Sequence, residues 1–120
     1  MNFVNESNSG NTILPLHGFD VFDNELASKG PRDATSVETT NKAIAWIAKN
    51  HRKKWFLWVH YLDPHGYYIE HMGFKKYGPK EVDKYDGEIA FSDYHLGRLL
   101  KELISIPGHE RTIIAITSDH

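Results

Sequence analysis

The hydrophobic pattern is strongest in residues 55–61, which are aromatic or aliphatic apart from His60 and show neither helical spacing nor polar alternation. Such a run predicts a strand buried on both faces, as in a parallel sheet. Pro64 lacks a backbone N–H and disfavours helix in the residue before it, so the strand should end near Asp63. His65 is therefore expected just beyond the carboxyl end of the strand, at the sheet edge where α/β proteins bind ligands.

A second apolar segment is also followed directly by polar residues. Residues 112–117 are apolar and β-branched and lead through Ser118 into Asp119 and His120. If the two strands are parallel in one sheet, His65, Asp119 and His120 emerge at the same edge. Such a convergence of polar groups is the minimum that a functional site requires.

Two amphipathic helices are predicted around these strands. Residues 36–50 place apolar side chains at helical spacing, after a possible capping box formed by Thr35 and Glu38. The inner face of this first helix is expected to carry Val37, Thr40, Ile44, Ile47 and Ala48. Residues 82–103 form the second helix, whose inner face is expected to carry Tyr85, Ile89, Leu96, Leu99, Leu100 and Leu103. This second helix connects the two strands, and such crossovers are right-handed in nearly all cases.

The remaining segments carry weaker patterns. Residues 66–80 have no steady period and are predicted to form a long loop that begins at His65 and faces the substrate. Residues 1–16 are interpreted as irregular or as a truncated upstream element, and residues 17–120 as one partial domain. His60 is expected to be a core histidine within its strand. The histidines interpreted as surface residues are His51, His71, His95 and His109.

Composition excludes several classes of function. The 120 residues include 40% hydrophobic and 25% charged side chains, which is ordinary for a globular domain. The formal net charge is −2 and the basic residues are scattered, so no nucleic-acid partner is indicated. The absence of cysteine excludes disulfides, thiolate metal sites and a cysteine nucleophile within the chain. Neither a signal peptide nor a membrane span is recognisable in the sequence.

The candidate chemistry has structural alternatives. Asp119 and His120 can offer a carboxylate oxygen and an imidazole nitrogen to one divalent ion, but two ligands are too few, and an Asp that caps a following helix is the better explanation of the dipeptide alone. His65 can donate to an anionic oxygen or a leaving group, or it can simply form a hydrogen bond with Asp63 or the backbone.

Four segments of the chain resemble segments of the sulfatases and follow one another in the same order. The strand ending "VHYLDPH" is similar to their "H-x-x-DPH" segment, and "YDGEIAFSD" followed by "LGRLL" resembles their "Y-D-x-E-I-x-x-x-D-x-x-(I/L)-G-x-(L/I)-L" helix. "TIIAITSDH" resembles the strand that ends in a metal-binding Asp-His or Asp-Asn, and "HGFDVFD" resembles an earlier "GFD" turn. The order and spacing of the four segments make this match specific.

The resemblance implies an α/β fold of the alkaline-phosphatase-like kind, a partial parallel sheet with crossover helices. It also implies that a divalent metal assists hydrolysis of a sulfate ester, either a small molecule or a sulfated glycan. His65 would contact the sulfate group as the catalytic and substrate-binding residue, and Asp119 and His120 would be metal ligands. Asp63 would position His65, while Glu88 and Asp93 would have structural roles. A periplasmic or extracellular location is expected by the same resemblance.

The chain departs from the family pattern in its missing parts. The family's formylglycine nucleophile arises from a "C/S-x-P-x-R" motif, which is absent here, and so is the upstream acidic pair of the metal site. The chain is therefore expected to be an internal piece of a longer sulfatase and inactive alone. Calcium is the metal expected by resemblance, whereas the imidazole of His120 shifts the preference toward manganese or zinc. The alternatives are a phosphodiester or phosphonate monoester hydrolase of the same superfamily and a noncatalytic binding module.

Overall fold

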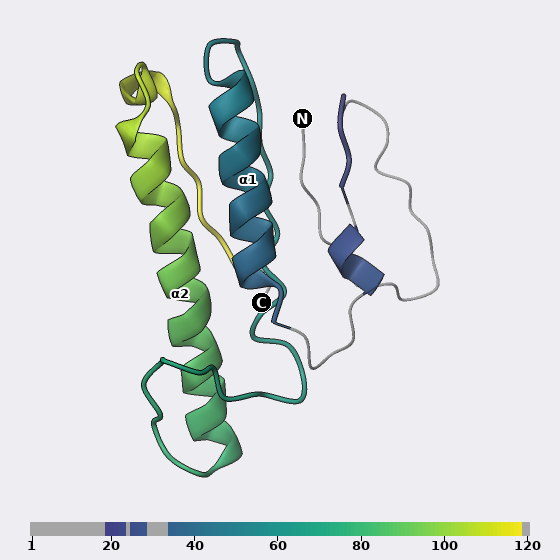
Figure 1. Ribbon diagram of the computed structural model, residues 1–120, viewed down its shortest axis with the longest axis vertical. Coiled ribbons are helices and arrows are strands. Elements are labelled where there is room, and N and C mark those ends of the chain that lie inside the picture. The colour runs from purple at the N-terminus through teal and green to yellow at the C-terminus, as the bar shows by residue number, and fades with distance from the viewer. Residues whose placement is uncertain (1–18, 24, 29–33, 119–120) are drawn as a thin grey trace.

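Two long helices dominate the computed structural model, which describes residues 19–23, 25–28 and 34–118 of the chain (Figure 1). Helix α1 covers Ser36–Asn50 and α2 covers Glu81–Ser105, while the short 3₁₀ helices η1 and η2 cover Glu25–Ser28 and His109–Arg111. Both predicted long helices are confirmed. The segment 1–16 and the turn at His17 lie outside the described residues. No helix in the described ranges is long and apolar enough to cross a membrane.

Helix α1 buries residues at the expected spacing of three to four. Thr40, Ala43, Trp46 and Ile47 are buried, but Val37, which was assigned to the inner face, is 39% exposed. Ala48, also assigned to the inner face, is exposed. The buried face instead includes Trp46, whose ring packs edge-on against Trp55 with ring centroids 6.0 Å apart.

The predicted capping box at the start of α1 is wrong. Thr35 is the N-cap residue, but its side chain makes no capping hydrogen bond to the helix. The Thr35 hydroxyl instead donates to the Asp63 carboxylate at 3.4 Å. A side chain from a different segment therefore caps this helix, which sequence neighbours alone cannot reveal.

Helix α2 buries an unexpected set of residues in its first half. The buried positions are Glu88, Phe91, His95, Leu99 and Leu103, which follow one another at steps of three or four residues. Tyr85 and Ile89, which were assigned to the inner face, are 37% and 43% exposed. The actual face includes two ionisable side chains, of which Glu88 contacts the loop 66–80 and His95 contacts Arg98. His71 and His95, interpreted as surface residues, are therefore corrected to buried side chains.

The core lies between the two helices. Ala43, Trp46 and Ile47 of α1 form one buried cluster with Leu99 and Leu103 of α2, and the partly buried Trp55, Leu57 and Val59 pack against it. Burying side chains of this kind is worth roughly 1.5–3 kcal/mol each relative to exposure. The first extended segment therefore returns along the helix pair instead of leaving it, as Figure 1 shows.

The first extended segment is apolar on both faces but buried on only one. Leu57 and Val59 pack on the helices, whereas Phe56 is 63% exposed and Trp58 is 47% exposed. The expectation of burial on both faces is thus wrong for the described residues. Phe56 does stack on Phe19, with ring centroids 6.1 Å apart, so part of the outer face is in contact with the segment 19–23.

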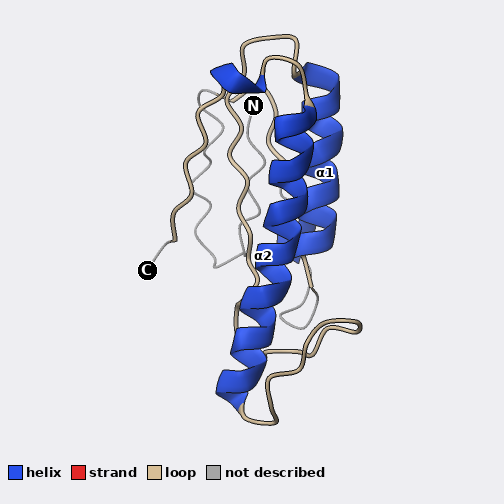
Figure 2. Ribbon diagram, turned by 90° about the vertical axis from the view of Figure 1, so that its left-hand side faces the viewer, coloured by secondary structure: helices blue, strands red, loops and turns tan. Residues whose placement is uncertain are grey.

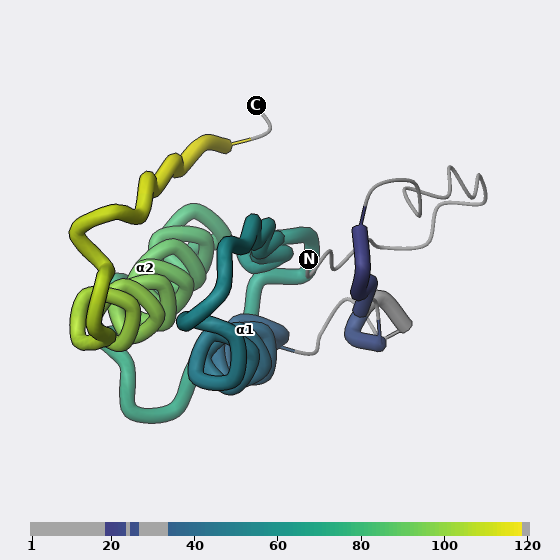
Figure 3. Tube along the Cα trace, turned by 90° about the horizontal axis from the view of Figure 1, so that it is seen from above, coloured from purple at the N-terminus to yellow at the C-terminus, as the bar shows by residue number. Residues whose placement is uncertain are grey.

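The second extended segment, residues 112–118, has the predicted conformation without the predicted burial. Ile113 is 94% exposed and Ile116 is 65% exposed. Within residues 19–23, 25–28 and 34–118, no strand of two or more residues is formed. Both extended segments run in the same direction from one end of the helix pair, and both lie on one side of it (Figures 2 and 3). Their pairing in a parallel sheet remains a prediction.

Candidate functional site

His65 lies at an exposed loop tip directly after the first extended segment. The peptide bond between Asp63 and Pro64 is cis, and Gly66 and Tyr67 both have a positive φ of 40°. Tyr67 is 67% exposed, and His65 and Gly66 are also exposed. The residues at the tip therefore face solvent, where a ligand can reach the imidazole of His65.

Asp63 fastens one side of this tip to the start of α1. Its carboxylate accepts hydrogen bonds from the backbone N–H groups of Thr35 at 3.1 Å and Ser36 at 2.8 Å, and from the Ser36 hydroxyl at 2.6 Å. These N–H groups have no partner inside the helix, and the helix dipole favours a negative charge at this end. Among the described residues, no hydrogen bond joins Asp63 to His65, so Asp63 acts on the tip by fixing the backbone.

Ser92 of α2 holds the same backbone from another direction. Its hydroxyl donates to the carbonyl oxygen of Asp63 at 2.9 Å and lies 3.4 Å from the hydroxyl of Ser36. Asp63 therefore joins α1 and α2 immediately before His65.

Glu88 holds the other side of the tip. This carboxylate is 4% exposed, and its Oε1 accepts the backbone N–H of Ile69 at 2.9 Å. Nε2 of His71 lies 3.2 Å from the same oxygen. The His71 ring stacks flat on Phe91, with centroids 3.6 Å apart and planes 3° apart. The loop after His65 is thus anchored on α2 by a buried polar cluster.

His95 is a buried base on the same helix face. Burial, with the nearby charge of Arg98, holds the pKa of His95 below its ordinary value. Arg98 Nη1 lies 3.1 Å from His95 Nδ1, and Nη2 donates to the side-chain oxygen of Asn41 at 2.9 Å. A guanidinium can only donate, so Nδ1 is the acceptor and the ring proton sits on Nε2. Arg98 therefore contacts His95 within α2 and links α2 to α1 through Asn41.

Tyr61 adds a second polar link behind the tip. Its hydroxyl lies 2.7 Å from the hydroxyl of Thr40 in α1, and burial raises the pKa of Tyr61. Thr40 also donates to the backbone carbonyl of His95 at 3.3 Å. The first contact holds Tyr61, at the end of the extended segment, against α1. The second contact joins α1 to α2 at the same place.

The predicted metal ligands Asp119 and His120 lie outside the described residues. Within the described ranges, no three His, Asp or Glu side chains come close enough to hold a metal ion. The expected meeting of His65 with Asp119 and His120 therefore stays a prediction.

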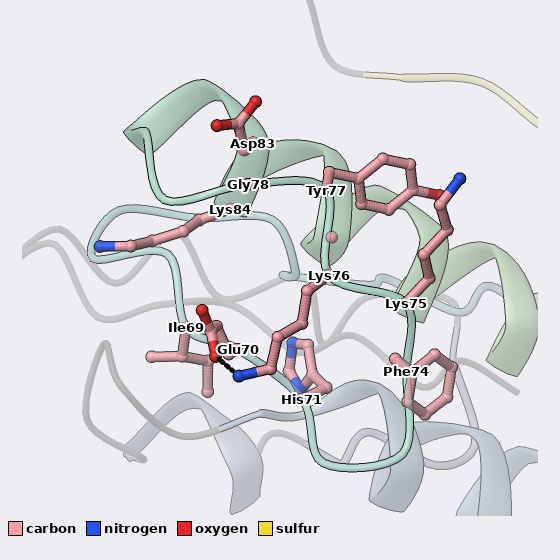
Figure 4. Close-up of a pocket in the computed structure, with 11 residues that line it drawn as sticks. Ile69, Glu70, His71, Phe74, Lys75, Lys76, Tyr77, Gly78, Asp83 and Lys84 are labelled. Atoms are coloured by element: carbon pink, nitrogen blue, oxygen red, sulfur yellow. Dashed lines mark hydrogen bonds and ion pairs between the residues drawn. The ribbon is translucent and has the colours of Figure 1, made fainter.

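A shallow pocket lies between the loop 66–80 and the start of α2 (Figure 4). Its charged side chains are largely compensated, because Lys76 is paired with Glu70 and Lys84 is paired with Glu81 at 2.6 Å. Lys75 lies over the ring of Tyr77, 4.8 Å from the centroid. The pocket thus offers no concentrated charge of one sign for a ligand.

The resemblance gives Glu88 a structural role but not its contact with the loop beside the tip. Sequence reasoning missed Ser36 and Ser92 as supports of the tip. A signal for Glu88 was present, because counting back from Leu103 through Leu99 in helical steps reaches His95, Phe91 and Glu88. Ionisable residues on an otherwise apolar helix face usually have buried polar partners. No such signal points to Ser36 or Ser92, whose partners lie 27 to 29 residues away in the chain.

Comparison with known proteins identifies a family. The family model described as "Sulfatase" matches residues 2–120. No curated protein matches the chain, and no solved structure matches it.

Proposed function

Because the chain belongs to the sulfatase family, we propose that it is part of an enzyme that hydrolyses sulfate esters and that His65 contacts the sulfate group. The family match over residues 2–120 is the observation that carries this proposal. The exposed position of His65 supports it, because a residue that binds an anion must be reachable. The substrate is a small sulfate ester or a sulfated glycan.

The proposed role of His65 follows from the chemistry of imidazole. A protonated imidazole donates hydrogen bonds from both nitrogens and carries a positive charge, and both properties favour an anionic oxygen. As charge develops on the sulfate oxygens and the leaving oxygen, a donor fixed in place stabilises the transition state without reorganising. His65 is suited to this role because hydrogen bonds fix the backbone at Asp63 and Ile69, on either side of the tip.

Asp119 and His120 are the proposed metal ligands. A carboxylate and an imidazole suit calcium less than manganese or zinc, although calcium is the metal expected in this family. The metal would supply Lewis-acid stabilisation of the sulfate charge when bound. The chain lacks cysteine and a "C/S-x-P-x-R" motif, so a formylglycine nucleophile and further acidic ligands are proposed to come from residues outside it. Alone, the chain is expected to bind a metal weakly and to show no turnover.

Hydrolysis assays on the complete gene product test the proposal. An aryl sulfate should be turned over faster than the matching aryl phosphate monoester, diester or phosphonate monoester, in a reaction that a metal chelator stops. Preference for a phosphodiester or a phosphonate would select the related hydrolase of the same superfamily. Binding of a sulfated glycan without turnover of any ester would select the noncatalytic module.

A further inference from the structure

We propose that Ser92 and Glu88 are positioning residues that hold the loop tip carrying His65 in one orientation from a single face of α2. The inference rests on the proposed function of His65 and adds two side chains that determine where the imidazole lies. Neither residue touches the substrate in this account. Both act through the backbone of residues 63–69.

The first anchor precedes His65 by two residues. Ser92 donates its hydroxyl proton to the carbonyl of Asp63 at 2.9 Å, while the Asp63 carboxylate is held by Ser36 at 2.8 Å through the backbone N–H. The backbone carbonyl and the side chain of Asp63 are thus bound to two different helices. The residue cannot rotate without breaking a hydrogen bond on one side, so the direction in which the chain enters the tip is fixed.

The second anchor follows His65 by four residues. Glu88 accepts the N–H of Ile69 at 2.9 Å and lies beside His71 Nε2 at 3.2 Å. A carboxylate that is only 4% exposed loses its hydration, which is costly unless hydrogen bonds replace the lost water. The hydrogen bond from Ile69 comes from the loop, whereas His71 Nε2 lies close to Glu88 without forming a hydrogen bond. The loop must therefore keep Ile69 in this position for Glu88 to keep its partner.

The spacing of the anchors forces the tip outward. Glu88 and Ser92 are one turn apart on α2, a rise of about 6 Å along the helix axis. The chain between residues 63 and 69 could reach about 20 Å if it were extended. It must therefore fold back on itself, and the positive φ of 40° at Gly66 and Tyr67 accomplishes the reversal. A left-handed conformation is unusual for tyrosine and persists only where the surroundings impose it.

Loss of either anchor should move the imidazole without unfolding the helices, because the helix core lies elsewhere, around Ala43, Trp46 and Leu99. A shift of about 1 Å in a residue that meets the reacting group can cost roughly 100-fold in rate. The expected signature is a lower kcat with a smaller change in KM, in a protein that melts close to the parent temperature.

Serine variants of α2 test the first anchor in the complete gene product. Ser92→Ala should lower kcat for an aryl sulfate about 10-fold to 100-fold, and Ser92→Thr should restore most of it by returning a hydroxyl. Ser105→Ala is the matched control, since its hydroxyl bonds to the Glu102 carbonyl at the far end of the same helix. This control should keep the parent kcat. A folded Ser92→Ala protein with the kcat of Ser105→Ala would overturn the first anchor.

Amide hydrogen exchange tests the second anchor without any substrate. Glu88→Ala should accelerate exchange at the Ile69 amide at least 10-fold, because this amide donates to Glu88, with Glu102→Ala on the exposed face of α2 as the control. An exchange rate at Ile69 equal to that of the control would overturn the second anchor. Should the protein hydrolyse no sulfate ester, the proposed function fails, while exchange at Ile69 still decides whether Glu88 holds the loop.

Discussion

At the scale of single residues, the buried histidines show how far a sequence pattern reaches. The sequence around His71 and His95 has no pattern that marks either histidine as buried, so the sequence analysis interprets both as surface residues. In the structure, both side chains are buried against Phe91. Their burial depends on which side chains from the loop and from α1 meet them in space. His65 could be recognised because Pro64 and the preceding apolar run mark its position locally.

The lowered pKa of His95 makes stability depend on pH. Burial and Arg98 lower this pKa, His71 adds a smaller effect in the same direction, and Asp63 opposes it. At a pH below the ordinary pKa of 6.5, His95 takes up a proton more readily in the unfolded chain than in the folded chain. The contribution of His95 to the free energy of unfolding is therefore complete above about pH 6.5 and declines as the pH falls toward the folded pKa. His95→Gln should therefore flatten the loss of stability between about pH 7 and pH 5.

Urea unfolding at a series of pH values measures this effect. His109→Gln is the control, because His109 is exposed and contacts only its own turn in the described residues. An equal pH dependence in the parent and in His95→Gln would show that His95 does not titrate differently in the folded chain.

At the scale of elements, the helices follow from the sequence much better than their surroundings do. The spacing of hydrophobic residues is a local property, so Ser36–Asn50 agrees with its predicted range. The start of α1 differs, because its cap is the carboxylate of Asp63, 27 residues beyond Ser36. A capping box was the natural local interpretation, and tertiary structure supplied a better acceptor.

Asp63 should therefore stabilise α1 measurably. Asp63→Ala leaves the N–H groups of Thr35 and Ser36 without this acceptor, which should lower the free energy of unfolding by about 1–2 kcal/mol. Asp63→Asn keeps one acceptor oxygen but loses the charge that favours the helix dipole, so its loss should be smaller. Asp86→Asn, on the exposed face of α2, is the matched control. Equal unfolding free energies for Asp63→Ala and this control would contradict the capping role.

At the scale of the whole molecule, the sequence predicted the order of helices and extended segments but not how the segments are covered. The two segments run in the same direction on one side of the helices (Figure 2), which is the orientation that a parallel pair requires. Trp58 at 47% exposure and Ile113 at 94% exposure show apolar faces that the described residues leave open. Apolar side chains along a segment predict that one of its faces can be buried. Which neighbouring segment covers that face depends on the complete fold.

The account of this chain as part of a sulfatase rests on two kinds of evidence, the sequence and the structural contacts. Family membership comes from the sequence over residues 2–120, and the anchoring of the His65 tip comes from contacts between segments that are far apart in the chain. The meeting of His65 with Asp119 and His120 is the remaining prediction, and it requires the two extended segments to end at one edge.

The most direct test is the effect of His65→Ala on the complete gene product, with His109→Ala as the control at an exposed histidine. Because the proposed contact is with the sulfate group, kcat for an aryl sulfate should fall about 100-fold to 1000-fold. The bound divalent metal, measured by mass spectrometry, should remain at the parent level in both variants. Loss of metal from His65→Ala with unchanged kinetics in the remaining metal-bound enzyme, or a kcat equal to that of His109→Ala, would contradict the account.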